Sequence, residues 1–305
     1  MKHAFILDPK HGTNIALMGN VSLHEQRADY GIKHYDVNEK NAYASLVFET
    51  NFTEAHNLSA GLSLNHDYLR QNLSLITPTA ILSNYGNLYP LKNNVESETT
   101  PGAYVQYTFN LHNHFIAMAG FRVDHSNVYG TFATPRFHVK WVATDFLTLR
   151  LSAGRGYRSP HALAENNYLL ASGRCLMVNQ PLKQEAAWNY GTSMALNIPL
   201  SNKTLKLNAE YYYTHFTNQT VIDYDSNPLE LHIGNLNGKS YSHTFQIDAS
   251  YPVFRGFELT AAYRYNLVKT TYGERLLSKP LQSRYKGLLT ASYKTPLGLW
   301  QFDAT

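Results

Sequence analysis

The residues best suited to bind a small molecule gather in one part of the chain, between residues 155 and 174. Arginines there can form paired hydrogen bonds with carboxylates and other anions, and the tyrosine and asparagines add aromatic and hydrogen-bonding surface. The candidate binding residues are Arg155, Tyr157, Arg158, His161, Asn166, Asn167 and Arg174. The arginines favour an anionic chelate as the bound molecule. The alternative is that they pair with Glu165 and brace this segment against the rest of the protein.

The same part of the chain offers no catalytic set. Ser159 and His161 are too close together in an irregular segment to form a triad, and no Gly-x-Ser-x-Gly motif occurs. Gly154 and Gly156 do not open a βαβ unit, so they form no dinucleotide-binding motif. The 14 histidines are spread through the chain without the spacing of a closed zinc site, and Cys175 is the only cysteine. We therefore predict no catalytic residue, no metal ligand and no cofactor, with His161 as the best exception among the histidines.

The segments that must position these residues alternate apolar and polar side chains. In the segment 203–216, Leu205, Leu207 and Tyr211 share one face, while Lys206 and Glu210 share the other. About ten such residues, rising roughly 3.3 Å each and tilted about 40°, cover the ~25 Å apolar band of a membrane. This pattern predicts transmembrane β-strands at 13–24, 40–52, 57–70, 101–111, 114–125, 134–143, 146–154, 186–199, 203–217, 240–252, 256–268 and 283–295, with a thirteenth starting near Leu299.

The predicted connections alternate between short and long. The tight turns are expected near Thr53–Asn57, His112–Asn113, Ala143–Asp145, Leu200–Asn202, Pro252–Arg255 and Pro296–Gly298. The long loops are expected near Glu25–Glu39, Gln71–Thr100, Arg155–Glu185, Asn218–Lys239 and Lys269–Gln282, with a shorter one near Ser126–Thr134. Long loops at only one end are typical of a transmembrane β-barrel, whose two ends face different compartments. The sequence thus predicts an all-β, antiparallel barrel.

Composition is consistent with this prediction. Only 16% of the 305 residues are charged. The sequence has no run of 18 apolar residues that could form a transmembrane helix. Barrel strands need no such run, because their apolar residues alternate with polar ones. The 23 tyrosines and 14 phenylalanines suit the aromatic girdles of a barrel. The net charge of +4 is scattered, so nucleic acid is not an expected partner.

One stretch of the sequence resembles the middle of a known barrel family. It comprises Thr134–Trp141, then Leu147–Pro160 with Gly154 and Gly156, where the glycines are expected to end a strand with a bend or bulge. Leu182-Lys-Gln-Glu185 then opens the next strand, and the later segment Tyr285–Tyr293 also fits. These segments are similar to TonB-dependent outer-membrane receptors, most closely the Bacteroides type. The likeness runs from about Tyr43 to Thr305.

The resemblance implies a 22-stranded barrel around a plug in the bacterial outer membrane, of which this chain supplies about 12 to 13 strands. We find no plug domain, no TonB box and no terminal strand ending in an aromatic residue. Residues 1–305 are therefore expected to be a partial barrel domain, truncated at both ends.

The resemblance also implies a function and partners. The function is import of a scarce ligand, energised by the TonB complex through the missing plug, and the surrounding partner is outer-membrane lipid. A ferric siderophore or other metal chelate is the first choice of ligand, while cobalamin, haem and oligosaccharides stay open. The alternatives are a passive porin and an outer-membrane β-barrel enzyme.

Overall fold

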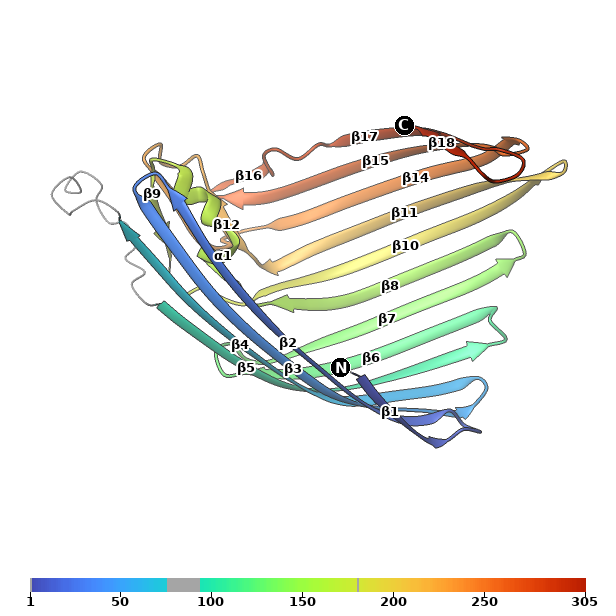
Figure 1. Ribbon diagram of the computed structural model, residues 1–305, viewed down its shortest axis with the longest axis horizontal. Coiled ribbons are helices and arrows are strands. Elements are labelled where there is room, and N and C mark those ends of the chain that lie inside the picture. The colour runs from blue at the N-terminus through green and yellow to red at the C-terminus, as the bar shows by residue number, and fades with distance from the viewer. Residues whose placement is uncertain (1, 76–93, 180) are drawn as a thin grey trace.

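One large antiparallel sheet makes up most of the protein. The structure, a computed structural model, describes residues 2–179 except 76–93, together with 181–305 (Figure 1). The sheet has 15 strands, and consecutive strands along the chain are neighbours except where loop elements intervene. Its strands are β1 (Lys2–Asp8), β2 (Thr13–Tyr30), β3 (Lys33–Thr53), β4 (His56–Leu75), β5 (Asn94–Leu111), β6 (Phe115–Ser126), β7 (Gly130–Thr144), β8 (Leu147–Arg158), β10 (Glu185–Leu200), β11 (Lys203–Asn218), β14 (Ser240–Phe254), β15 (Phe257–Tyr272), β16 (Arg275–Ser278), β17 (Tyr285–Lys294) and β18 (Gln301–Ala304).

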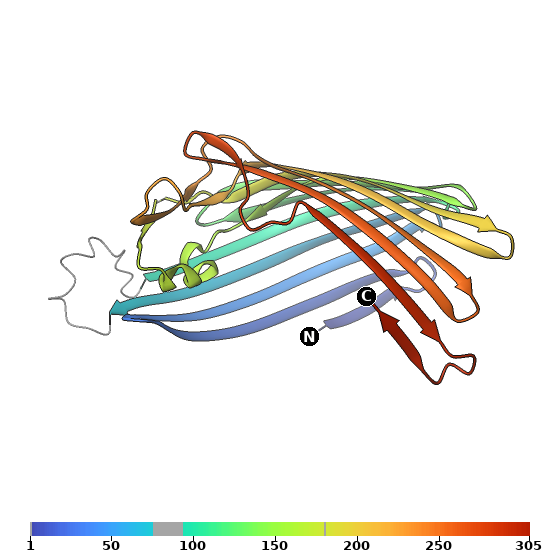
Figure 2. The same ribbon diagram turned by 90° about the horizontal axis from the view of Figure 1, so that it is seen from above.

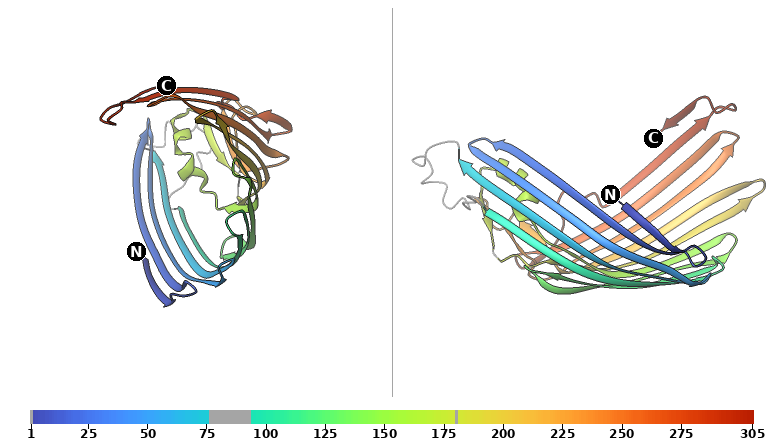
Figure 3. Two further views of the ribbon diagram at one scale, coloured as in Figure 1. Left: turned by 90° about the vertical axis from the view of Figure 1, so that its right-hand side faces the viewer. Right: turned by 60° about the horizontal axis from the view of Figure 1, so that its bottom comes forward.

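The sheet curves into a trough, as Figures 2 and 3 show from two further directions. This is the all-β, antiparallel wall that the alternating pattern predicts. Each of the six predicted tight turns lies between two neighbouring strands, and all of them lie at one end of the trough. We call this the turn end and the opposite one the loop end. Within the described residues, no helix is long and apolar enough to cross a membrane.

Two long loops carry the remaining elements, and both fold into the concave side of the sheet at the loop end (Figure 3). The loop after β8 contains α1 (Ala162–Glu165), the 3-10 helix η2 (Asn167–Ala171) and β9 (Cys175–Val178). The loop after β11 contains β12 (Thr220–Asp223) and β13 (Glu230–Asn235). β12 pairs with β13 in antiparallel fashion and β13 pairs with β9 in parallel, so the two loops share a three-stranded sheet. We call residues 159–184 and 219–239 the mouth loops.

The most completely buried apolar side chains lie between the mouth loops and the wall. Their cluster, the mouth core, consists of Tyr35, Val37, Leu69, Leu73, Leu163, Leu169, Leu170, Leu176, Leu231 and Ile233. The first four come from β3 and β4, and the others from the mouth loops. Burial of apolar surface therefore holds the loops against the concave face, at roughly 25 cal/mol per Å².

Several predicted loops are shorter in the structure. The prediction of a loop over Glu25–Glu39 is wrong, because β2 and β3 pair as far as Tyr30 and Lys33 and are joined by a tight turn at Gly31, whose φ is +63°. The apolar side chains of this hairpin end, such as Tyr35 and Val37, lie on the concave face, and the opposite face carries polar residues such as Arg27 and Asp36. The outward apolar face that marks a membrane strand is therefore missing here. The loops after Ser126 and Lys269 are shortened in the same way, by strands β7, β15 and β16.

Other boundaries also differ from the predictions. β4 continues to Leu75 and β5 starts at Asn94, so the predicted loop Gln71–Thr100 is shorter at both ends, and its centre lies outside the described residues. Strand β1 was not predicted. The predicted bulge at Gly154 and Gly156 is wrong as well, because β8 pairs with β10 in unbroken register through both glycines to Arg158.

Candidate functional site

Two of the cavities that the described residues form at the loop end lie on either side of the first mouth loop. The acidic cavity has a volume of about 460 Å³ and is lined by Asp67, Glu96, Glu98, Tyr129 and His161, among others. The tyrosine cavity has a volume of about 620 Å³ and is lined by Tyr168, Tyr224 and Tyr272, among others. Leu163 lines the first cavity and Glu165 lines the second, so the short helix α1 separates them.

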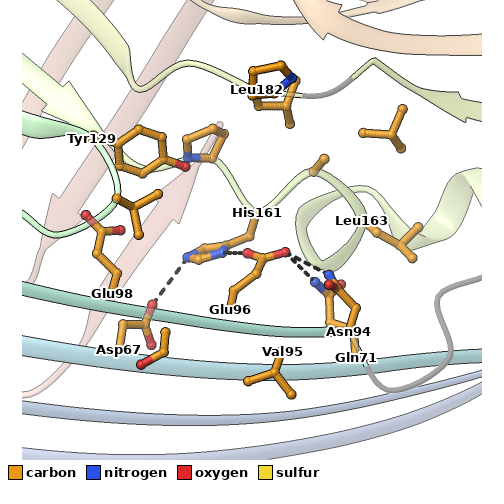
Figure 4. Close-up of a pocket in the computed structure, with 16 residues that line it drawn as sticks. Asp67, Gln71, Asn94, Val95, Glu96, Glu98, Tyr129, His161, Leu163 and Leu182 are labelled. Carbon is orange, nitrogen blue, oxygen red and sulfur yellow. Dashed lines mark hydrogen bonds and ion pairs between the residues drawn. The ribbon is translucent and has the colours of Figure 1, made fainter.

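His161 bridges two carboxylates in the acidic cavity (Figure 4). Its Nε2 lies 3.2 Å from an oxygen of Asp67 on β4, and its Nδ1 lies 3.0 Å from an oxygen of Glu96 on β5. These hydrogen bonds, that to Asp67 before that to Glu96, raise the pKa of His161 to about 10 although burial opposes the shift. The imidazole is therefore protonated at neutral pH, and each ring nitrogen donates to one carboxylate. We call this arrangement the His161 bridge.

The other carboxylates of the acidic cavity also have partners in the wall. Glu96 accepts hydrogen bonds from Gln71 and Asn94, at 3.1 and 3.2 Å, and Glu98 accepts one from Ser126 at 2.6 Å. Charged and polar groups that satisfy one another contribute to structure more than to the capture of a further molecule. The acidic cavity therefore ties the first mouth loop to β4 and β5.

A second polar contact holds the same loop. Lys33, at the start of β3, is buried, and its Nζ donates to the backbone carbonyls of Leu170 and Ser172, at 3.1 and 2.8 Å. Its ammonium satisfies carbonyls at the end of η2, where a positive charge is favourable. The loop is thus fixed to the wall at His161, at Lys33 and through the mouth core.

The tyrosine cavity is built from both mouth loops, the ends of β8, β10 and β15, and residues 279–281, which follow β16. The hydroxyls of Tyr168 and Tyr224 lie 3.2 Å apart, and Tyr168 is 55% exposed. Arg174 donates from Nη1 to the carbonyl of Tyr224 at 2.7 Å, which fixes the backbone that carries this tyrosine. Burial raises the pKa of the Tyr224 hydroxyl, so the phenol stays protonated and able to donate a hydrogen bond.

A pair of glutamates holds Arg158 at the wall of the tyrosine cavity. The guanidinium lies 2.9 Å from Glu165 of α1 and 2.7 Å from Glu185 of β10. Glu185 also accepts the backbone N–H of Thr220, the first residue of β12, at 2.8 Å. Glu185 therefore connects the wall to both mouth loops.

We expect Glu185→Ala to loosen the start of the second mouth loop. The backbone N–H of Thr220 loses a charge-assisted partner, which is worth roughly 1.5–3 kcal/mol. Amide hydrogen exchange at Thr220 should become at least about tenfold faster. Glu165→Ala is the matched control, because Glu165 also binds Arg158 but does not contact Thr220. Equal exchange in the two variants would contradict this role of Glu185.

The structure places the seven candidate binding residues in different surroundings. Arg158 and Asn166 line the tyrosine cavity, and His161 lines the acidic cavity. Asn167 accepts a hydrogen bond from the hydroxyl of Tyr30 at 2.8 Å, and Arg174 donates one to the backbone carbonyl of Tyr224.

Arg155 and Tyr157 belong to β8 and not to the loop that the sequence predicted. They share the face of β8 that carries Leu149 and Leu151, opposite Arg158, which contacts α1 on the concave side. The guanidinium of Arg155 lies over the rings of Tyr157 and Trp188, with 4.8 and 5.8 Å to the ring centroids. These residues form a cation–π cluster on the convex face.

The partners of these residues escaped the sequence analysis. Asp67, Glu96, Tyr224 and Tyr272 lie far from Arg155–Arg174 along the chain, in predicted strands or loops without a distinctive motif. Among the described residues, no group of three or more His, Cys, Asp and Glu is arranged to hold a metal ion.

The fold of this chain is similar to part of the barrel in several solved structures. The ferripyoverdine receptor of the outer membrane of Pseudomonas aeruginosa aligns with a TM-score of 0.63 and 13% identity, over 96% of this chain and 42% of the receptor. The copper transporter OprC aligns with a TM-score of 0.67 and 14% identity, over 93% and 46%. The FrpB iron transporter of Neisseria meningitidis (F3-3 variant) aligns with a TM-score of 0.58 and 14% identity, over 93% and 49%. The chain therefore spans about half the length of these proteins.

The family follows from the sequence as a whole. A model of the TonB dependent receptor-like β-barrel matches residues 8–305, so the chain belongs to this family, and the resemblance seen in the sequence is confirmed. No curated protein sequence matches the chain at a significant level.

Proposed function

We propose that this chain is part of the barrel of an outer-membrane receptor that imports a scarce ligand with energy from the TonB complex. Membership of the TonB-dependent receptor-like family supports this proposal and favours a receptor over an enzyme. The observation that carries it is the position of the mouth loops, which fold into the concave side and enclose cavities at one end of the wall. A passive porin needs an open lumen, whereas a receptor needs a place to hold its ligand.

The partners follow from the two faces of the wall. The convex face exposes apolar side chains such as Val21, Leu23 and Leu151, at 71, 75 and 55%, and these suit contact with outer-membrane lipid. Contact with TonB is proposed to run through a plug domain that this chain does not include. Residues 1–305 would then be a partial barrel domain of the longer receptor.

A ferric siderophore or another metal chelate is the ligand class that we propose first. Several of the similar structures are described as a siderophore receptor, an iron transporter or a copper transporter. Of the seven candidate residues, we propose that Arg158 and Asn166 line the binding region, because they border the tyrosine cavity, and that His161 holds the first mouth loop in place beside it. Arg174 and Asn167 would stabilise the binding region through their hydrogen bonds to Tyr224 and Tyr30. Arg155 and Tyr157 lie on the opposite face of the wall.

Uptake in living cells tests this function. The intact receptor is produced in a Gram-negative strain that lacks its own siderophore receptors, and the cells are supplied with a panel of ⁵⁵Fe-labelled siderophores. We expect one of these chelates to accumulate, and we expect deletion of TonB to abolish accumulation while leaving binding at the cell surface. Accumulation that persists without TonB would contradict the proposal in favour of a passive porin.

A further inference from the structure

We propose that the tyrosine cavity holds a flat aromatic part of the ligand, recognised by ring stacking and phenol hydrogen bonds. This inference rests on the proposed function, because it specifies the ligand class of the same receptor. It differs from recognition of an anionic chelate by arginines, which the sequence favoured. Three features of the loop end carry it: the pairing of the arginines, the structural contacts of His161 in the acidic cavity and the lining of the tyrosine cavity.

The arginines are engaged with the protein itself. Arg158 contacts two glutamates, Arg174 donates to a backbone carbonyl, and Arg155 lies on the convex face against two aromatic rings. An anion at Arg158 would have to compete with two carboxylates at 2.7 and 2.9 Å, and an anion at Arg174 would have to share the guanidinium with the carbonyl of Tyr224. The charged residues lining the tyrosine cavity are two cationic and three acidic, namely Arg158, Lys279, Glu165, Glu185 and Asp225. Such a cavity does not select for negative charge.

The acidic cavity offers little to a ligand for a related reason. The protonated His161 already pairs with Asp67 and Glu96, and neighbouring groups hydrogen-bond to Glu96 and to one oxygen of Glu98, whereas one buried oxygen of Asp67 has no hydrogen-bond partner among the described residues. A ligand that used His161 or Glu96 would have to break the contacts that fix the first mouth loop. The tyrosine cavity is therefore the better place for a ligand.

The lining of the tyrosine cavity matches a flat ring system. Three tyrosines stand beside the apolar side chains of Val221, Ile222, Pro280 and Leu281. Aromatic pairs whose ring centroids are 4.5–7 Å apart gain about 0.5–1.5 kcal/mol beyond the burial of their area, and the exposed ring of Tyr168 is open to such a pair. The adjoining hydroxyls of Tyr168 and Tyr224 supply the few placed polar groups that orient a ligand in an apolar pocket.

Two neutral iron chelates that differ only in their rings test this inference. Ferric tris(benzohydroxamate) carries three phenyl groups, and ferric tris(acetohydroxamate) carries methyl groups in their place. Each is kept fully formed with excess hydroxamic acid and titrated calorimetrically against the purified intact receptor. We expect the phenyl chelate to bind at least about tenfold more tightly.

Variants locate the effect in the cavity. Tyr168→Leu with Tyr272→Leu removes two rings, and we expect it to weaken binding of the phenyl chelate at least about tenfold. Tyr168→Phe with Tyr272→Phe keeps the rings, and its affinity should stay within about threefold of the unmodified receptor. Circular dichroism and amide exchange in the mouth loops verify that both double variants are folded.

The outcomes separate this inference from the proposed function. Equal affinity for the two chelates, equal affinity of the Leu and Phe variants, or no binding of either chelate would overturn the aromatic assignment. TonB-dependent uptake of some other chelate would then still support the receptor. If the receptor prefers the phenyl chelate but uptake does not need TonB, the aromatic assignment of the tyrosine cavity would stand and the proposed import mechanism would be overturned.

Discussion

Replacing His161 by Leu is expected to release the first mouth loop from β4 and β5. The side chain is only 23% exposed, and its removal leaves Asp67 and Glu96 facing each other without the cation between them. Removing one partner of a fully buried ion pair typically costs about 3–5 kcal/mol, and the cost here is smaller because Glu96 is 40% exposed. Amide hydrogen exchange in residues 159–178 should accelerate at least about tenfold, while exchange in the strand ladder stays slow.

His125→Leu provides the control for this substitution. His125 is exposed and hydrogen-bonds Thr131 at 2.8 Å, without an acidic partner in that contact. Its replacement should leave exchange in the mouth loops unchanged. Unaltered protection of residues 159–178 in His161→Leu would show that the mouth core alone holds the loop.

The pH dependence of the His161 bridge follows from its raised pKa. A histidine with a pKa of about 10 in the folded protein and about 6.5 in the unfolded chain stabilises the folded state fully below pH 6.5. This contribution shrinks as the pH rises and is lost above about pH 10. Amide hydrogen exchange in residues 159–178 is measured at each pH in the unmodified protein and in His161→Gln. The ratio of the two rates cancels the intrinsic pH dependence of exchange, and it should approach one near pH 11. A ratio that approaches one already at pH 7 to 8 would contradict the bridge.

Ile233→Ala is expected to detach the second mouth loop. Ile233 lies on β13, has no exposed surface and packs in the mouth core. Truncating a buried isoleucine costs about 2–5 kcal/mol through lost apolar contact and the cavity left behind. Because β13 pairs with both β12 and β9, amide exchange should accelerate in all three strands together.

Ile247→Ala is the matched control for this truncation. Ile247 lies on β14 and is 40% exposed, so the same change removes less buried surface there. The mouth loops should keep their protection in this variant. Exchange that accelerates only in β13 of Ile233→Ala, with β9 and β12 unaffected, would refute a shared core between the two loops.

The sequence determined the wall of the protein because strand patterning is local. Side chains alternate across a strand with a period of two, so Leu205, Leu207 and Tyr211 identify an apolar face without knowledge of their neighbours. Turn residues at Ser201 and Asn113, which adopt positive φ in the structure, mark the tight turns equally well. The pattern did not reveal the hairpin end around Gly31, because the face of β2 and β3 that is apolar in the membrane becomes polar there, while Tyr35 and Val37 turn their apolar side chains to the concave face.

The candidate site depended on tertiary structure. The sequence predicted one binding segment at 155–174, yet Arg155 and Arg158 lie on opposite faces of one strand, and this placement follows from the extension of β8 to Arg158. The contacts that decide the chemistry join distant positions: His161 meets Glu96 across 65 residues, and Lys33 meets Leu170 across 137. Such pairs arise from the curvature of the sheet and the inward folding of the mouth loops. Neither leaves a local period in the sequence, because the burial that drives them is summed over residues from many segments of the chain.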